Sequence, residues 1–171
     1  MEQKKTERIN RILTHPSYIE YVSQNAEKEQ DRVFCHHDMG HFLDVARLAE
    51  ILNLTEAYGQ DAELIYAAAL LHDIGRHIQY ETGEDHALVS ARMAPAILKD
   101  CGFMQEEAEQ IVSAIATHRL AEVRDRKDLN GLLYRADKLS RPCYCCKQES
   151  ACNWKLSLIH ISEPTRQAEI S

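Results

Sequence analysis

Apolar residues recur along most of this chain at intervals of three and four, which is the spacing of one face of an α-helix. The stripe is clearest in residues 38–54, where it consists of Phe42, Val45, Leu48, Ala49 and Leu52. Comparable stripes predict further helices over residues 17–30, 61–75, 82–102, 105–119 and 128–141. Alternation of the kind found in strands is scarce. The sequence therefore predicts an all-α fold, a bundle of about six or seven helices without a sheet.

Several of the predicted helices carry end signals. Asp61 is a suitable N-terminal cap, and Gly75 is a suitable left-handed terminator for the same helix. Thr82 stands three residues before Asp85 and resembles a capping box for the next helix. Because proline lacks a backbone N–H, we expect Pro95 to kink that helix or to divide it in two.

Composition and charge narrow the class of protein. The 171 residues suffice for one domain with a core, and 44% hydrophobic with 27% charged residues is typical of a globular chain. The net charge of -7 and the lack of a basic stripe disfavour nucleic acid as a bulk partner. No apolar run approaches the roughly 20 residues of a membrane span, and the first ten residues lack a signal-peptide core. We expect a cytoplasmic protein without a membrane, and leave a homo-oligomer open.

The candidate chemistry lies on the inward faces of the predicted helices. Nine histidines is a high number for this length. A single histidine on an apolar face is usually a hydrogen-bonded core residue, but a buried carboxylate needs a cationic side chain or a metal. Here four histidines and two acids from five helical segments face inward together, which hydrogen bonds alone satisfy poorly. They are His41, His72, Asp73, His86, His118 and Asp137.

The sequence motifs around these residues resemble those of a known family. The motifs are HFLDVARLA at 41–49, AALLHDIGR at 68–76 and YRADKLS at 134–140. Together with the order His41, His72-Asp73, Asp137, they resemble the HD superfamily of metal-dependent phosphohydrolases. The resemblance runs from about Cys35 to Arg141. His86 and His118 resemble the extra histidines of the subset that holds two metal ions.

The resemblance implies a binuclear metal centre. Asp73 would bridge the ions, one of which would take His41, His72 and Asp137, and the other His86 and His118. Asp73 and His72 would be the catalytic pair. Imidazole with carboxylate suits manganese, iron, cobalt or zinc, and magnesium less well. Two such ions can activate water and clamp a phosphate group.

The resemblance also implies a substrate class. We expect hydrolysis of phosphate monoester, diester or anhydride bonds in a small, phosphorylated, nucleotide-like substrate. Two alternatives stay open, because fold does not fix chemistry: a di-iron oxygenase on the same ligands, and a non-catalytic nucleotide-binding regulator. Candidate phosphate contacts are Arg76, Arg119 and Lys138, each beside a predicted ligand, although each could equally be a solvated helix-end charge. His37 is a further candidate for contact with the substrate, or with the metal ligands.

The remaining segments complete the expected organisation. Residues 1–34 are a helical extension and residues 35–142 the HD domain, followed by a cysteine-rich segment at 143–155. Four cysteines within ten residues suit a thiolate metal site, but Cys143 and Cys146 meet the usual spacing only loosely. We therefore expect free thiols and assign no ligand there. Residues 156–171 closely resemble a translated sequencing adapter and are expected not to be native, so we exclude them from the fold.

Overall fold

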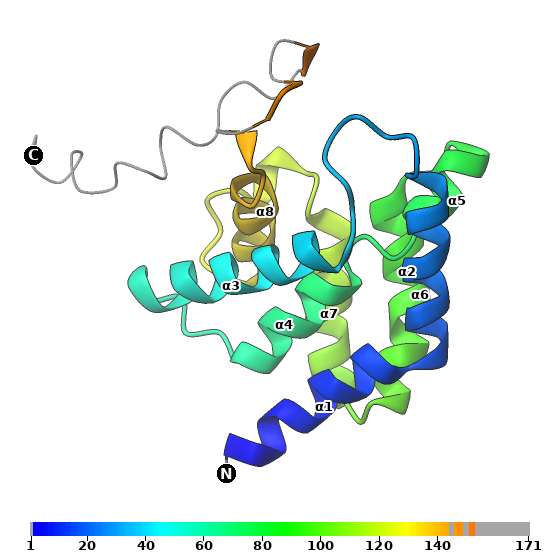
Figure 1. The fold of residues 1–171 in the computed structure, drawn as a ribbon. Coiled ribbons are helices and arrows are strands. Elements are labelled where there is room, and N and C mark those ends of the chain that lie inside the picture. Colours follow the sequence, from blue (N-terminus) through cyan, green and yellow to red (C-terminus); the bar gives the residue numbers. More distant parts are fainter. Residues whose placement is uncertain (1, 144–145, 149–150, 153–171) are drawn as a thin grey trace, which may run out of the picture.

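The structure is a computed structural model that describes residues 2–143, 146–148 and 151–152, with side chains from residue 7 onward. Every regular element in this part of the chain is helical, which confirms the all-α fold class (Figure 1). The elements are α1 (Glu2–Thr14), α2 (Pro16–Lys28), α3 (Met39–Thr55), α4 (Ala62–Leu71), α5 (Arg76–Thr82), α6 (His86–Asp100), α7 (Gln105–Thr117), the short 3-10 helix η1 (Ala121–Val123) and α8 (Leu129–Leu139). The sequence did not distinguish α1 and α5 as separate helices.

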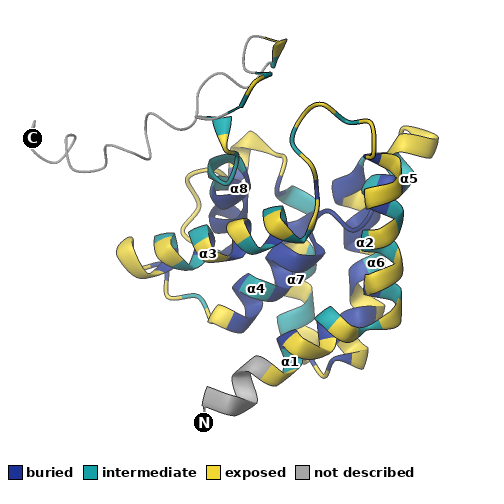
Figure 2. Cartoon of the chain, viewed as in Figure 1, coloured by how far each residue is buried: buried dark blue, intermediate teal, exposed yellow. Residues whose placement is uncertain are grey.

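Helix α4 forms the centre of the bundle. Eight of its residues are buried, including the run Ala67–Leu71, and a helix that is apolar all round belongs in a core. It packs against α1, α3, α7 and α8, while α2 and α5 pack together beside α6. Buried residues gather where the helices face one another (Figure 2). No helix among the described residues is long and apolar enough to cross a membrane.

The N-terminal helix α1 is fastened across the bundle by one arginine. Arg8 forms ion pairs with Glu63 and Glu107, each at 2.6 Å, and its guanidinium lies 4.3 Å from the centre of the Phe103 ring. These partners belong to the beginning of α4 and to the region where α7 begins. A single side chain therefore links three helices.

Gly75 does not terminate a helix in the left-handed conformation, so that prediction was wrong. Helix α4 ends at Leu71, residues 72–75 form a turn, and the φ angle of Gly75 is -89°. Glycine is needed there for space. A Cβ would lie 2.6 Å from the Val89 Cγ1 atom and 2.8 Å from the Ser90 nitrogen of α6. The turn therefore lies directly against the backbone of α6, and Gly75 N–H donates to Ser90 Oγ at 2.9 Å.

The predicted start of α6 also differs. Asp85 is the N-terminal cap, and its side chain accepts from the Ala87 N–H. Thr82 instead ends α5 and donates its hydroxyl to the Ile78 carbonyl, so no capping box forms there. Helix α6 runs through Pro95 and is not divided. Asp61 caps α4 as predicted, accepting from the Glu63 N–H.

Candidate metal centre

The fold brings all six predicted ligands to one place, at the ends of several helices. Capping positions the first of them, because the Asp38 carboxylate accepts from the His41 N–H at 3.0 Å and starts α3 there. The others come from the turn after α4, the first residue of α6, the end of α7 and the interior of α8. All six side chains are buried or nearly so; they belong to His41, His72, Asp73, His86, His118 and Asp137.

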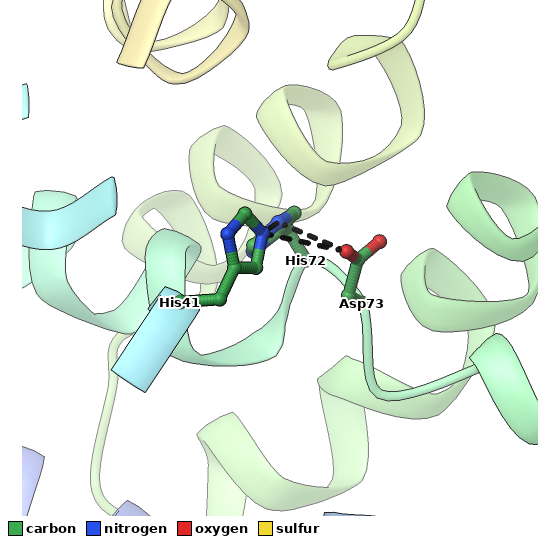
Figure 3. Close-up of side chains that lie close together, drawn as sticks. All are labelled: His41, His72 and Asp73. Carbon is green, nitrogen blue, oxygen red and sulfur yellow. Dashed lines mark hydrogen bonds and ion pairs between the residues drawn. The ribbon is translucent and has the colours of Figure 1, made fainter. Parts of the chain in front are cut away.

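Asp73 lies between two pairs of histidines. Its Oδ2 atom is 3.7 Å from His41 Nε2 and 3.3 Å from His72 Nε2. Its Oδ1 atom is 3.0 Å from His86 Nε2 and 3.6 Å from His118 Nε2. The result is two compact clusters of potential metal ligands that share one carboxylate. Figure 3 shows the first cluster, in which His41, His72 and Asp73 point toward one another.

Asp137 also faces the first cluster. Its Oδ1 atom is 3.5 Å from His41 Nε2 and 3.8 Å from His72 Nε2. Its other oxygen accepts from Lys138 Nζ at 2.6 Å. Two imidazoles and two carboxylates therefore surround the first position, whereas two imidazoles and one carboxylate surround the second.

Hydrogen-bond partners outside the centre orient the four histidine rings. In each ring Nδ1 lies within hydrogen-bond distance of an oxygen outside the centre, which leaves Nε2 to point inward, as metal-binding histidines do. Carbonyl oxygens can only accept, so the ring nitrogens facing them must donate. The partners are Ala69 O for His72 at 2.6 Å, Ile115 O for His118 at 2.7 Å, Gln79 Oε1 for His86 at 2.8 Å and Ser140 Oγ for His41 at 3.3 Å.

Two features of the centre call for a cation. The Nε2 atoms of His41 and His72 are only 3.3 Å apart, and Asp73 Oδ1 is buried without a hydrogen bond in the described part of the chain. Burial lowers the pKa of His72, but the charges of Asp73 and Asp137 outweigh it and raise that pKa to about 10. Burial and the nearby His72 cation lower the pKa of His118 to about 3. In the first cluster a proton on His72 can supply positive charge. In the second, the imidazoles around Asp73 Oδ1 are neutral, and this arrangement suits a metal ion.

A cavity of about 400 Å³ opens onto both clusters and has a cationic lining. All four predicted substrate contacts line it: His37, Arg76, Arg119 and Lys138. Arg32 and Arg141 line it as well, and the sequence analysis missed both. Arg141 stands one helical turn after Asp137, and that spacing was an available signal.

His37 contacts the centre and is itself held by a buried acid. Its Nε2 atom is 3.8 Å from Asp73 Oδ2 and accepts from Arg76 Nη2 at 2.6 Å, and its Nδ1 atom is 2.5 Å from Glu29 Oε1. Burial raises the pKa of Glu29, but the His37 and Tyr80 hydrogen bonds outweigh it and lower that pKa to about 2. Glu29 is therefore ionised, and it fixes the His37 ring at the cavity wall.

Asn25 of α2 supports the centre through the backbone. Its side-chain amide donates to the Asp73 carbonyl at 2.9 Å and accepts from the His77 N–H at 2.8 Å. Neither Asn25 nor Glu29 was found from the sequence. The available signal for Asn25 was a polar residue facing the core side of its helix, because it is fully buried.

Comparison with known proteins identifies related chains. The profile of the HD domain matches residues 38–141. An uncharacterized protein of Clostridium beijerinckii is 45% identical over 150 residues, which cover 86% of this chain and 92% of that protein. Ribonuclease Y of Rubrobacter xylanophilus is 34% identical over 80 residues, or 47% of this chain, but the match spans only 14% of that enzyme.

A solved structure has the same fold. The crystal structure of a predicted HD superfamily hydrolase from an uncultured Thermotogales bacterium superposes with a TM-score of 0.54 and 31% sequence identity. The match covers 71% of this chain and 66% of that chain.

Proposed function

This chain belongs to the HD domain family, and from that premise we propose that it is a metal-dependent hydrolase of phosphate ester or anhydride bonds in a small nucleotide-like substrate. The observation that carries the proposal is the position of Asp73. One carboxylate oxygen faces His41 and His72, and the other faces His86 and His118. A bridging carboxylate between two imidazole pairs is suited to two divalent ions.

Six side chains would hold the two ions. His41, His72 and Asp137 would bind one, His86 and His118 would bind the other, and Asp73 would contact both. When bound, such ions polarise phosphate oxygens and lower the pKa of water, which supplies a nucleophile near neutral pH. Nitrogen and oxygen donors of this kind suit manganese, iron, cobalt or zinc. His72 and Asp73 are the catalytic residues in this proposal: Asp73 is shared by the two clusters, and His72 is its neighbour in the first.

The cavity lining supports an anionic substrate. Although the whole chain is acidic, the cavity carries the cations Arg32, Arg76, Arg119, Lys138 and Arg141. A volume of about 400 Å³ is within the usual range for small-molecule sites. Cations confined to a cavity favour a compact phosphate group over a long polyanion.

Arg76 is the most clearly oriented of these cations. Its Nη2 atom donates to His37 Nε2 at 2.6 Å and its Nη1 atom donates to Gln79 Oε1 at 2.8 Å. Its Nε atom is buried without a hydrogen bond in the described part of the chain. The guanidinium lines the cavity and is held next to His37, which lies 3.8 Å from Asp73, and a guanidinium placed in this way is suited to a phosphate oxygen. We propose that Arg76 binds and orients the phosphate, while Arg119 and Lys138 contact the rest of the anion.

The relatives support phosphate chemistry on nucleotides. The name Ribonuclease Y denotes an enzyme that cleaves RNA, and the match to this chain spans only 14% of that enzyme. We therefore propose nucleotides or short phosphodiesters as the class to test first, with mononucleotides, dinucleoside polyphosphates, cyclic dinucleotides and a short RNA in the panel.

The decisive experiment measures metal and turnover in one preparation. Protein purified without oxygen should contain divalent metal by elemental analysis and release phosphate or nucleoside products with manganese or iron. Asp73→Ala should lose metal retention and lower turnover at least about 100-fold, with helical content unchanged by circular dichroism. Asp44→Ala is the matched control, because that carboxylate is exposed on α3 and should leave both unchanged.

Three outcomes would contradict the proposal. Full turnover by Asp73→Ala would mean that the centre is placed wrongly. Oxygen uptake in aerobic solution, together with no phosphate release in a parallel assay under argon, would favour a di-iron oxygenase. Saturable nucleotide binding with no product over hours would indicate a regulator.

A further inference from the structure

A second group of metal-binding side chains lies outside the His/Asp centre. Cys35 comes from the loop before α3, and Cys143, Cys146 and Cys152 come from the segment that follows α8. Cys35 and Cys152 nevertheless line the same cavity. Burial raises the pKa of the Cys35 thiol, and the nearby thiols of the other three raise it further. Two segments far apart in the sequence therefore place four thiols in one neighbourhood.

The local backbone of the later segment is shaped for thiolate ligands. The Cys146 N–H donates to the Cys143 carbonyl at 3.2 Å, so the backbones of these two cysteines lie close together. The Gln148 N–H donates to Cys146 Sγ at 3.4 Å. Two cysteines separated by two residues are a common half of a zinc site.

Positive charge surrounds the same place. Arg141 lies close enough to Cys35 to lower the pKa of its thiol, against the larger effect of burial. Arg32 donates to the Cys35 carbonyl at 2.7 Å and so holds the loop that carries this cysteine. Four thiolates around a divalent ion leave a net charge of about minus two, and these arginines offset it.

We propose that Cys35, Cys143, Cys146 and Cys152 bind one zinc-type ion, which fastens the segment after α8 to the rim of the cavity. All four are free thiols, and each would give up its proton to solvent as it binds. In the described residues no three of their sulfurs lie within 4.8 Å of one another, so the side chains must turn inward on binding. The sequence spacing alone assigned no ligand here, and the new observation is that Cys35, from a distant loop, lies near the three described cysteines of this segment.

The ion would shape one wall of the cavity. Ala151 and Cys152 belong to the lining, alongside Phe34 and Cys35 of the opposite loop. In Figure 1 this segment and the loop before α3 lie at the same end of the molecule. The site is separate from the His/Asp centre and does not depend on the reaction proposed for it.

Cobalt(II) distinguishes the two centres by spectroscopy. The full chain, reduced and freed of metal by chelation, is titrated with cobalt without oxygen. Sulfur-to-cobalt charge-transfer absorption reports thiolate ligands only, because none of the six His/Asp ligands contains sulfur. We expect this absorption to reach the intensity of about one thiolate-bound cobalt per chain and to be abolished by added zinc. Asp73→Ala should retain it, so a failed His/Asp centre leaves this test intact.

Single-cysteine variants locate the ligands. Cys35→Ser and Cys146→Ser should each lose most of the charge-transfer absorption and one equivalent of tightly held zinc. Cys101→Ser, a buried cysteine of the bundle core at the end of α6, is the control and should retain both. In the zinc-loaded chain, the four thiols should also resist alkylation, as measured by peptide mass spectrometry.

Several results would overturn the proposal. They are the absence of charge-transfer absorption in the unmodified chain, its full retention in either cluster variant, or equal alkylation with and without zinc. Disulfides among the four cysteines in anaerobically purified protein, found by intact mass, would also refute it.

Discussion

At the residue scale, the most consequential group is the Asp73 carboxylate. Each of its oxygens faces a different histidine pair, and the Oδ1 atom has no hydrogen bond in the described residues. Asn25 donates to its backbone carbonyl, and its carboxylate is buried among the four imidazoles. An aspartate constrained in this way favours bound cations over an empty centre.

A single histidine variant tests the assignment of the two positions. His118→Ala removes one of only three ligands of the second cluster. In chains loaded with manganese, which thiolates bind poorly, it should lower the manganese content from two ions to about one per chain. Elemental analysis after desalting measures this directly. His36→Ala is the control and should retain two ions, because that side chain is half exposed in the loop before α3. Two ions in His118→Ala would show that the second position lies elsewhere.

The ligands could be predicted from sequence, but their supports could not. His41, His86 and His118 lie on the apolar stripes of their helices, so helical periodicity alone predicted that they face inward. Asn25 and Glu29 gain their meaning from Asp73 and His37, to which no local pattern connects them. Contacts between distant segments are invisible to periodicity, and these are what tune the site.

At the scale of elements, the turn between α4 and α5 positions the centre. It carries His72 and Asp73 and lies against α6, which carries His86. The helices themselves were predictable because their stripes are local. Their junctions were not. The fit of Gly75 against α6 is a contact between distant segments, and Thr82 ends α5 and accepts from the Glu84 N–H instead of capping α6.

Substitution of Gly75 tests this close approach. In Gly75→Ala the added Cβ would meet Val89 and the Ser90 backbone at 2.6–2.8 Å, so the turn must shift. We expect a loss of about 1–3 kcal/mol in the free energy of unfolding, measured in urea, together with weakened metal retention.

Gly83→Ala provides the contrast. Gly83 has a left-handed φ of 79°, but nothing lies within 4 Å of a Cβ there. It should lose stability through its backbone alone and retain metal. Unchanged metal content in Gly75→Ala would contradict the prediction that this turn positions the centre.

At the scale of the whole molecule, the centre joins most of the bundle. Its ligands come from α3, α6, α8, the end of α7 and the turn after α4. Bound ions would therefore stabilise the fold as a unit, by about 2.7 kcal/mol when free metal is a hundred times its dissociation constant. The all-α architecture followed from the sequence because every layer of the bundle is built from helices with local stripes.

Metal removal should change how stability depends on pH. In the metal-free chain the pKa of His72 is raised to about 10, against burial, by Asp73 and Asp137. Its contribution is complete below about pH 6.5 and is lost as the pH rises through about 10. His118, with a pKa lowered to about 3 by burial and by His72, weakens the fold as the pH falls below about 6.5.

Melting temperatures measured with and without a chelator check this prediction. The metal-free chain should be most stable near pH 6.5 and should lose stability on the alkaline side. The metal-loaded chain should not show the alkaline loss, because an ion and not a proton then occupies His72. Parallel alkaline declines in both samples would contradict the assignment of that proton to His72.

The position of Asn25 has a consequence for how the His/Asp centre can be transplanted into another protein. Helix α2 precedes the segment 38–141 that matches the family, yet it grips the backbone of Asp73. A chimera cut at the family boundary would leave the Asp73 carbonyl without the hydrogen bond from the Asn25 side-chain amide. It would also lose Glu29. The smallest exchangeable module therefore begins at Pro16, where α2 starts, and recombination that keeps the chemistry should carry this helix along with it.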